Sequence, residues 1–337
     1  MGTYKNLKGF KVPTYSADPV VTAGWATGGA MNTTRYQMGA AGTPTAALTG
    51  SGATPFPYSR ETEEYNGTGW TVATDHPWAS GFEGAGWCGV QTAALVAGGY
   101  HGPPGDGDWA NAYLYDGTNW AATGSMASAR THGGLCGTTS AGLWAGGQPV
   151  PIHSLCEEFD GSTWAVQNEL NTARRNNTSS GIQTDAMTVG GVYADGPNTW
   201  KAEEYDGTSW TVGGQLNTGR MLMQNPGGGS SASAAIVAGG TPAGPGSSKV
   251  ANVESYNGTT WTELTVMPWV SETGGGTGPA TNYLVCGGGS PAVNTTAVYS
   301  ENSEPNTFLL EGQVWYNSTD GDLKFYDGSA IKTVTIS

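Results

Sequence analysis

Short apolar and aromatic segments alternate with glycine-containing turns along most of the chain, and one pair of segments recurs. In one copy a segment ends at Tyr205, the turn Asp206-Gly207 follows, and the next segment begins at Trp210. Asn-Gly and Asp-Gly are strong hairpin signals because both residues tolerate positive φ. The pattern therefore predicts two short antiparallel strands. Further copies lie at residues 65–70, 115–120, 159–164 and 256–261.

A second marker precedes these hairpins: a short strand of small apolar residues that ends in two glycines. It occurs at residues 93–99, 142–147, 186–191, 235–240 and 283–288, and residues 46–52 form a degenerate copy. The chain thus has six glycine markers against five complete hairpins. Because such internal periodicity indicates a repeat architecture, we expect an all-β fold built from one small sheet per repeat.

The strand that the last repeat lacks is predicted at the start of the chain. Three of the hairpin tryptophans are followed ten residues later by an arginine, and Trp25 is followed in the same way by Arg35. The last repeat reaches Tyr299 and then has no tryptophan. We therefore expect the strand at Trp25 to complete the sheet formed by residues 271–299. Such closure leaves no free radial edge, which is how propellers avoid exposed edge strands.

The order of the markers, a Gly-Gly doublet, then Tyr, then Trp about six residues on, resembles the kelch repeat family. The resemblance covers roughly residues 20–300 and implies a six-bladed kelch-like β-propeller, with four strands per blade and the last blade closed by the N-terminal strand. The chain departs from the family at Gly50-Ser51-Gly52 in the first repeat. Two repeats also lack the arginine and contain Pro77-Trp78 and Pro268-Trp269 instead.

The repeated residues have structural explanations. The Gly-Gly doublets allow close packing of neighbouring sheets, and each tryptophan buries on the order of 200 Å². The repeated arginines are expected to pair with glutamates of nearby strands. The arginines are Arg35, Arg130, Arg174 and Arg220, and the expected partners are Glu64, Glu158 and Glu204. Asn66 and Asn257 match a glycosylation pattern, but Asp replaces Asn in three other copies, so turn chemistry explains them better.

Composition and charge narrow the function. The chain of 337 residues has 55 Gly, 18 Pro and 12% charged residues, with a net charge of −14. Residues 20–302 hold 8 basic and 21 acidic side chains, a net −13 that disfavours nucleic-acid binding by this region. No apolar run has the roughly 18 residues of a membrane span, and the start resembles no signal peptide. The four cysteines are scattered and are expected to be buried thiols.

Repeat length varies mainly between the Gly-Gly doublet and the following tyrosine. These loops are expected on one face of the propeller, together with the linkers between blades, and a rigid scaffold commonly carries its binding residues on such loops. The alternative is that these residues are merely solvated or packed locally. The candidate binding residues, which we expect to be exposed, are Trp78, Tyr100, His101, Asp106, Trp109, His153, Tyr193 and Trp269.

No catalytic, cofactor or metal constellation is predicted. His132 and Cys136, with His153 and Cys156, superficially resemble zinc-ligand spacing. However, the two cysteines are expected on strands about 10 Å apart, which disfavours one shared metal. Asp106-Gly107-Asp108 and Asp320-Gly321-Asp322 lack the further ligands of a calcium loop, although the sequence does not decide whether calcium binds. The prediction is a protein that is not an enzyme.

The two ends lie outside the repeats. Residues 1–19 are predicted as an anchoring arm, residues 20–302 as the propeller, and residues 303–337 as a C-terminal β-hairpin extension. The tail motif, Gly312-Gln313-x-Trp315-Tyr316-Asn317 followed by Leu323-Lys324-x-Tyr326-Asp327-Gly328, resembles a hairpin of tailed-phage appendage and other virion proteins. The start, Thr3 to Gly9, is similar to that of kelch-like structural proteins from marine and cyanophage-type phages.

The resemblance implies a non-enzymatic virion structural protein, assembled in the host cytoplasm, either a tail fibre or appendage or a capsid-decorating protein. The ends would contact other virion proteins, and the propeller loops would bind a host-surface glycan or protein, without nucleic acid or membrane insertion. A homo-oligomer is left open. The expected assembly residues are Lys5, Lys8, Trp315, Tyr316, Phe325 and Tyr326. The alternatives are an intracellular kelch-type interaction module and, third, a secreted carbohydrate-acting enzyme.

Overall fold

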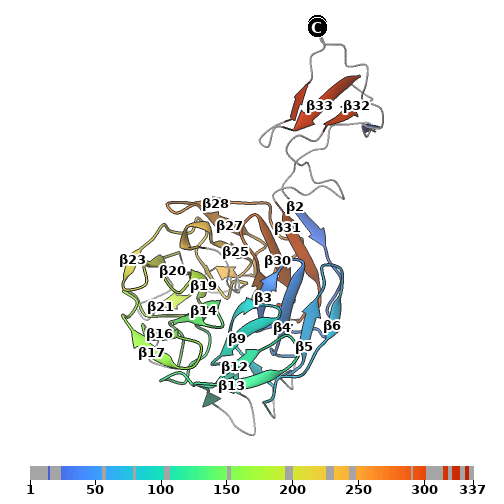
Figure 1. Cartoon of the computed structure of the whole chain (residues 1–337). Coiled ribbons are helices and arrows are strands. Elements are labelled where there is room, and N and C mark those ends of the chain that lie inside the picture. The colour runs from blue at the N-terminus through green and yellow to red at the C-terminus, as the bar shows by residue number, and fades with distance from the viewer. Residues whose placement is uncertain are drawn as a thin grey trace. The chain divides into compact units, whose positions relative to one another are not determined.

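The fold is all-β and consists of many small antiparallel sheets in a propeller-like arrangement, seen in a computed structural model (Figure 1). The structure describes residues 14–15, 24–54, 58–78, 81–101, 107–149, 153–193, 200–224, 231–242, 248–289, 291–300, 314–317, 321–326 and 331–333. The chain divides into two units. One is Trp25–Ser300, and the other joins Met1–Gly24 to Glu301–Ser337.

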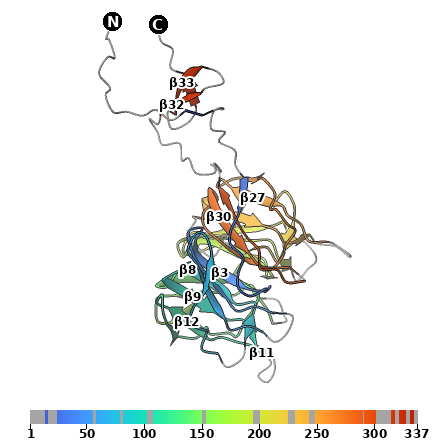
Figure 2. The same cartoon turned by 90° about the vertical axis from the view of Figure 1, so that its right-hand side faces the viewer.

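The sheets of Trp25–Ser300 repeat one topology, in which consecutive strands run from the inside of the unit to its outside. The first sheet orders β3 (Gly39–Thr43), β4 (Ala46–Gly50), β5 (Thr62–Tyr65) and β6 (Trp70–Val72). The second orders β8 (Gly86–Val90), β9 (Ala93–Ala97), β12 (Ala112–Tyr115) and β13 (Trp120–Thr123), and Figure 2 shows β8, β9 and β12 side by side. The third orders β14 (Gly134–Thr138), β15 (Ala141–Ala145), β16 (Cys156–Phe159) and β17 (Trp164–Gln167).

The remaining sheets follow the same order. The next contains β19 (Thr178–Ile182), β20 (Asp185–Val189), β22 (Ala202–Tyr205) and β23 (Trp210–Val212). The one after it contains β25 (Ile236–Ala238), β27 (Val253–Tyr256) and β28 (Trp261–Glu263), with a short 3₁₀ turn at Ala232–Ala234. The last contains β29 (Gly275–Thr277), β30 (Asn282–Cys286), β31 (Thr296–Ser300) and β2 (Gly24–Thr27).

Short strands flank the points where the chain enters and leaves some of these sheets. They are β7 (Phe82–Glu83) with β10 (Tyr100–His101) and β11 (Gly107–Asp108), β18 (Arg174–Arg175) with β21 (Val192–Tyr193), and β24 (Arg220–Met221) with β26 (Thr241–Pro242).

The N-terminal strand completes the last sheet, as the sequence predicts. β2 lies beside β31, and the ring centroids of Trp25 and Tyr299 are 5.4 Å apart. The Trp25 indole Nε1 also donates a hydrogen bond of 2.8 Å to the carbonyl of Thr265. The first and last parts of Trp25–Ser300 are therefore joined in one sheet, so the outer strand of that sheet comes from the opposite end of the unit.

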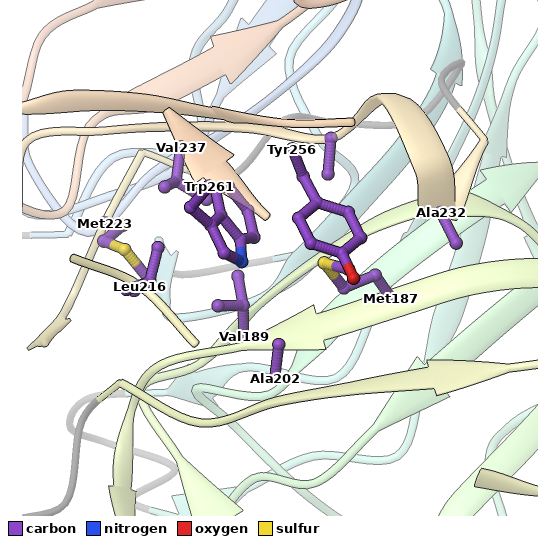
Figure 3. Packing of buried hydrophobic residues seen from close by; sticks show 10 residues of the cluster. Met187, Val189, Ala202, Leu216, Met223, Ala232, Val237, Tyr256 and Trp261 are labelled. Atoms are coloured by element: carbon purple, nitrogen blue, oxygen red, sulfur yellow. The ribbon is translucent and has the colours of Figure 1, made fainter. Parts of the chain in front are cut away.

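The core is divided into clusters that lie between neighbouring sheets. Between the sheet containing β20 and the sheet containing β27, Tyr256 and Trp261 point toward Met187, Val189 and Ala202 (Figure 3). All five side chains are at most 5% exposed. Because each sheet is covered on both faces, strands such as β9 are apolar along most of their length rather than alternating. The four cysteines are buried free thiols, which confirms that prediction.

The hairpin turns are stabilised by the side chain at their first position. Asn66 Oδ1 accepts hydrogen bonds from the backbone amides of Thr68 at 3.0 Å and Gly69 at 2.9 Å. Asp116, Asp160, Asp206 and Asn257 do the same in the other copies. Tyr65 pairs with Trp70 across this turn, so the loop has four residues. Gly67 has a φ of 91°, where glycine is favoured. Turn chemistry therefore accounts for the repeated Asn or Asp.

The repeated arginines pair with glutamates, but the predicted partners are wrong by one residue. Arg174 Nη2 lies 2.6 Å from Glu203 Oε1, and both side chains are at most 2% exposed. The other pairs are Arg35 with Glu63, Arg130 with Glu157, and Arg220 with Glu254. Side chains alternate between the two faces of a strand, so a shift of one residue reverses the face. The arginine lies on the face of the first glutamate of each pair.

The predicted partners contact the next sheet instead. The Tyr115 hydroxyl donates a hydrogen bond of 2.9 Å to Glu64. Tyr205 and Tyr256 donate in the same way to Glu158 and Glu204. The two adjacent glutamates therefore have different roles. The first pairs with the arginine of its own sheet, and the second accepts a hydrogen bond from the neighbouring sheet.

The other unit contains a sheet formed by both ends of the chain. Its order is β1 (Thr14–Tyr15), β32 (Val314–Asn317), β33 (Asp322–Tyr326) and β34 (Ile331–Thr333). β1 is parallel to β32, whereas β32 is antiparallel to β33. The segments predicted as a separate arm and tail thus share one sheet, and the described main unit runs from Trp25 to Ser300.

We expect Arg174→Met to lower the free energy of unfolding by roughly 3–5 kcal/mol, because the buried Glu203 carboxylate would lose its counter-ion. Arg60→Met is the matched control. Arg60 pairs with Asp75 at 3.1 Å, but both side chains are more than one third exposed, so its loss should cost less than about 1 kcal/mol. Urea unfolding of both variants measures the difference. Equal costs would contradict the structural role of the buried pair.

Two shortened chains test closure by the N-terminal strand. A chain that begins at Gly24 retains β2, whereas one that begins at Gly28 lacks it. We expect the shorter chain to lose about 2 kcal/mol or more of stability and to associate through the uncovered backbone edge of β31. Thermal unfolding and size-exclusion chromatography with light scattering measure both effects. Two equally stable monomers would rule out a structural role for β2.

Candidate functional site

The chain enters each sheet of the main unit through a residue in the left-handed backbone region. This residue lies two positions before the first residue of the innermost strand, or, in the repeat of Leu222, two positions before Gln224. In the described part of the chain these residues have φ between 56° and 64°. They are Gln37, Gly84, His132, Asn176, Leu222 and Thr273. Residues other than glycine rarely adopt such a φ unless their surroundings impose it. The recurrence indicates that the same constraint acts at each of these positions.

Backbone hydrogen bonds join these residues in a closed circle. Each amide from Gly84 to Thr273 donates to the carbonyl of the preceding member, at distances of 2.7–3.1 Å. The circle closes where the Met38 amide donates to the Thr273 carbonyl at 3.3 Å. The sheets therefore meet around one axis, and the side chains of these residues are brought together from distant parts of the sequence.

A cavity of about 60 Å³ lies on this axis. It is lined by the six residues of the circle and by the residue that follows each of them. This volume accommodates a few water molecules or the polar head group of a ligand, but not a whole sugar ring. The lining combines amide, imidazole and hydroxyl groups with the apolar side chains of Leu222, Met38 and Met223.

His132 has polar contacts at both of its ring nitrogens at the cavity wall. Its Nε2 lies 3.3 Å from Gln37 Nε2, and its Nδ1 lies 3.0 Å from Thr131 Oγ1. Burial, with the nearby charge of Arg175, lowers the pKa of His132 to about 4. The imidazole is therefore neutral at physiological pH.

The residue before each member of the circle varies in chemistry from sheet to sheet. These residues are Tyr36, Glu83, Thr131, Arg175, Met221 and Glu272. Arg175 Nη1 donates a hydrogen bond of 2.7 Å to Gln148 Oε1, and Gln148 Nε2 lies 3.4 Å from His132 Nδ1. A chain of polar contacts thus connects the guanidinium to the imidazole at the cavity wall. This arrangement offers donors of several kinds to a polar ligand.

Among the carboxylates near the axis, Glu83 has the largest change in pKa. Burial raises the pKa of Glu83 to about 7, and the hydrogen bond from Tyr58 opposes that rise. Burial, together with the Glu83 charge, raises the pKa of Tyr58 to about 12. Glu83 can therefore carry or release a proton near neutral pH. No group of three His, Cys, Asp or Glu side chains in the described residues is placed to hold a metal ion.

The predicted loop residues are packed more tightly than expected. Trp78, His101 and Tyr193 are 4%, 5% and 2% exposed, so the expectation that they are exposed is wrong. Tyr100, Trp109, His153 and Trp269 are half-buried. Asp106 lies outside the described residues. The structure brings Trp78, His101 and Trp109 together. Tyr193 lies instead on β21, the His153 backbone amide donates to the Gly147 carbonyl, and Trp269 packs against a different core cluster.

Trp78, His101 and Trp109 form part of an aromatic cluster around His76. The His101 and Trp109 rings stack at 4.4 Å, and Trp78 meets Trp109 edge-on at 5.1 Å. His76 is 1% exposed, with four aromatic rings at centroid distances of 4.5–4.7 Å. Neither of its ring nitrogens has a hydrogen-bond partner in the described residues. Burial accordingly lowers the pKa of His76 to about 3.

Tyr193 is fixed by cationic neighbours rather than presented to solvent. The Arg174 guanidinium lies 4.9 Å and the Lys201 ammonium 5.1 Å from its ring centroid. Such cation–π contacts stabilise a packed ring. Of the expected assembly residues, Lys5 and Lys8 lie outside the described residues. Trp315, Tyr316, Phe325 and Tyr326 lie on β32 and β33, but their side chains also lie outside the described set.

Sequence reasoning missed the residues of the circle. It searched the loops that follow the Gly-Gly doublets and the tryptophans of two linkers, Trp78 and Trp269, instead. A usable signal was present: Gln37, His132, Asn176, Leu222 and Thr273 each lie twelve residues after the repeated tryptophan. Gly84 follows Trp70 by fourteen residues because that linker is two residues longer. A position that varies within an otherwise constant frame is a candidate for function.

Comparison with known proteins shows the fold alone. No protein-family model matches the chain, and no curated protein matches it in sequence. Among solved structures, that of YjhT is similar, with a TM-score of 0.66 and 12% sequence identity. The match covers 91% of this chain and 99% of YjhT. The described residues contain no helix long and apolar enough to span a membrane.

His76 predicts a dependence of stability on pH. Its pKa is lowered in the folded chain, so below about pH 6.5 the unfolded chain binds more protons. The stability contributed by the neutral imidazole is present above that pH. It is lost at about 1.4 kcal/mol per pH unit on acidification, or roughly 3 kcal/mol by pH 4. We expect His76→Met to make the stability profile less steep between pH 6.5 and 4, and His132, whose pKa is also lowered, to account for acid sensitivity that remains.

Urea unfolding across this pH range measures the effect. Methionine fits the site because Met126 and Met267 occupy the equivalent positions, six residues after the tryptophan, in other repeats. The variant and the unchanged chain should agree to within about 1.5 kcal/mol at pH 8. An unchanged acid slope in His76→Met would show that the buried imidazole does not cause it.

Proposed function

We propose that the chain is a non-enzymatic virion structural protein of a tailed phage. Its main unit would be a recognition domain, and the unit formed by the two ends would be its anchor. The observation that carries the proposal is the sheet β1-β32-β33-β34, in which the two ends of the chain pair. Both ends resemble virion proteins in sequence, and their pairing supports a common role in one anchoring module.

The fold assigned to the main unit is a six-bladed β-propeller closed by β2. Six glycine markers in the sequence and the six members of the hydrogen-bonded circle support this count. β32 and β33 would form the hairpin extension of the anchor. A propeller closed in this way is a rigid support for recognition residues, and a binding role needs no catalytic group.

Recognition is assigned to the axial cavity and the loops around it. The cavity presents Gln37, His132 and Asn176, which suits a polar ligand such as part of a host-surface glycan. An intracellular interaction module is the competing function. A carbohydrate-acting enzyme is third, and the raised pKa of Glu83 is the observation that would favour it.

Mass spectrometry of purified phage particles tests the virion assignment. We expect the protein in particles at a fixed copy number, and immunogold labelling should place it on the tail or the capsid. A chain that lacks residues 301–337 should retain the thermal unfolding transition of the main unit but fail to join particles. Loss of incorporation follows from removing β32–β34, the strands of the anchor.

Two other results would contradict the virion assignment. Abundant protein in infected cells with none in particles would favour the intracellular interaction module. Turnover of an oligosaccharide that Glu83→Gln abolishes would favour the enzyme. Val212→Ser is the control for incorporation, since Val212 is an exposed side chain of the main unit and its change should leave assembly intact.

A further inference from the structure

Arg175 differs from the other arginines of the described residues in its lack of a counter-ion. Each of the other arginines has a carboxylate partner: Arg35 with Glu63, Arg60 with Asp75, Arg130 with Glu157, Arg174 with Glu203, and Arg220 with Glu254. Arg175 forms no ion pair with any carboxylate in the described part of the chain. Its sequence neighbour Arg174 takes the structural role, so Arg175 is an additional cation in this repeat.

The guanidinium of Arg175 is linked through Gln148 to His132, which lines the cavity. The side chain is half-buried, and its Nη1 donates to Gln148 Oε1 at 2.7 Å. Gln148 in turn lies against His132, whose ring is fixed by Thr131 and Gln37. A guanidinium held in this way loses little side-chain freedom when it binds an anion.

The electrostatics of the axis leave this charge uncompensated. Glu83 and Glu272 occupy the equivalent positions of other sheets, but Thr131 and Met221 separate them from Arg175 along the circle. Glu272 already accepts a hydrogen bond from Thr241, and Glu83 is partly protonated near neutral pH. His132 is neutral there. Partial removal of a guanidinium from water without a counter-ion is unfavourable, and a bound anion would offset that cost.

The size of the cavity limits what can enter. About 60 Å³ suits an oxyanion head group, with the remainder of the ligand outside. Planar guanidinium groups match the paired oxygens of carboxylates and phosphates. Asn176 lines the same cavity and offers an amide to a neighbouring hydroxyl of the ligand.

We propose that Arg175, with Gln148, His132 and Asn176, forms a binding site for the oxyanion head group of an acidic sugar at the axial cavity. The head group is a carboxylate or a phosphoryl group. The ligand enters head group first, and its sugar ring lies over the mouth of the cavity. This inference rests on the proposed recognition role and names the chemistry that the main unit recognises.

Titration of the full chain with glucuronate, glucose 6-phosphate and glucose tests the proposal. The three probes share one sugar ring and differ mainly in the head group. At pH 7.5 and low salt, where electrostatic screening is weak, we expect an acidic probe to bind at least about tenfold more tightly than glucose. Comparison of the two acidic probes identifies the head group. Inorganic sulfate should compete with the bound probe.

Arg175→Gln should weaken binding of the acidic probe at least about tenfold and leave glucose unaffected. Arg175→Lys, which keeps the charge but loses the planar group, should give an intermediate affinity. Arg60→Gln removes an arginine with a carboxylate partner of its own and should bind as the unchanged chain does. Thermal unfolding verifies that each variant is folded, and competition by sulfate needs no variant.

Equal affinity for all three probes, no binding of either acidic probe, or undiminished binding by folded Arg175→Gln would overturn the proposal. These results are separable from the virion assignment. Association with particles is measured independently, and it depends on the ends of the chain rather than on Arg175.

Discussion

The buried glutamate that holds the linker entering its own sheet is the interaction on which the rest of the main unit depends. In the sheet containing β22, Glu203 accepts hydrogen bonds from the backbone and side-chain amides of Asn171 and from the backbone amide of Thr172, as well as from Arg174. One carboxylate thus joins the third strand, the linker and the start of the sheet. A buried charge is tolerable when its partners satisfy it in this way. Glu63 and Glu254 make the same set of contacts.

The repeats that lack the buried arginine also lack the buried glutamate, which supports the view that each charge is tolerated only with its partner. The two repeats without the arginine have Phe82 and Ser271 in its place, and the same two repeats have Tyr113 and Ala297 in place of the glutamate. Neither member of the pair is left without the other, because an isolated buried charge would be strongly destabilising. In one of these repeats the space is filled by the aromatic cluster around His76, which includes Phe82 and Tyr113.

Contacts between sheets show the same coupling. Where a sheet offers Glu64, Glu158 or Glu204, the next sheet offers a tyrosine whose hydroxyl donates to it. Where the sheet has Leu114 instead, the next sheet has Phe159, which lacks the hydroxyl, and the two side chains pack in one cluster. The repeats are therefore not independent copies. These four sheet interfaces are matched in polarity, since an unpartnered buried hydroxyl or carboxylate costs free energy.

The sequence predicted the frame because periodic features report on periodic structure. The hairpins, the small-residue strands and closure by Trp25 all follow from repeated spacing. The glutamate partners were predicted wrongly because Glu63 and Glu64 are adjacent, and spacing alone does not select a face. The repeat with Arg220 contains Glu254 followed by Ser255, so alignment of the repeats would have identified the first glutamate.

Exposure was harder to predict than strand order. Trp78, His101 and Tyr193 belong to loops by sequence, but they are buried. Trp78 and His101 pack against aromatic rings of neighbouring segments, and Tyr193 packs against Arg174 and Lys201. Aromatic residues bury large areas wherever partners are near, and the sequence does not reveal those partners. Composition therefore identifies a loop as unusual without showing whether its side chains face solvent or the core.

The side chains of the residues in the circle vary from repeat to repeat because the fold does not depend on them. The circle of backbone hydrogen bonds uses main-chain groups alone, so it constrains φ but not the identity of most side chains. His132, Asn176, Leu222 and Thr273 adopt nearly the same φ with unrelated chemistry. Since the buried pairs and matched interfaces already stabilise the sheets, substitution at the circle changes the lining of the cavity at little cost to the fold. The residues that stabilise each repeat are therefore different from those that line the cavity, and only the second set is free to diverge.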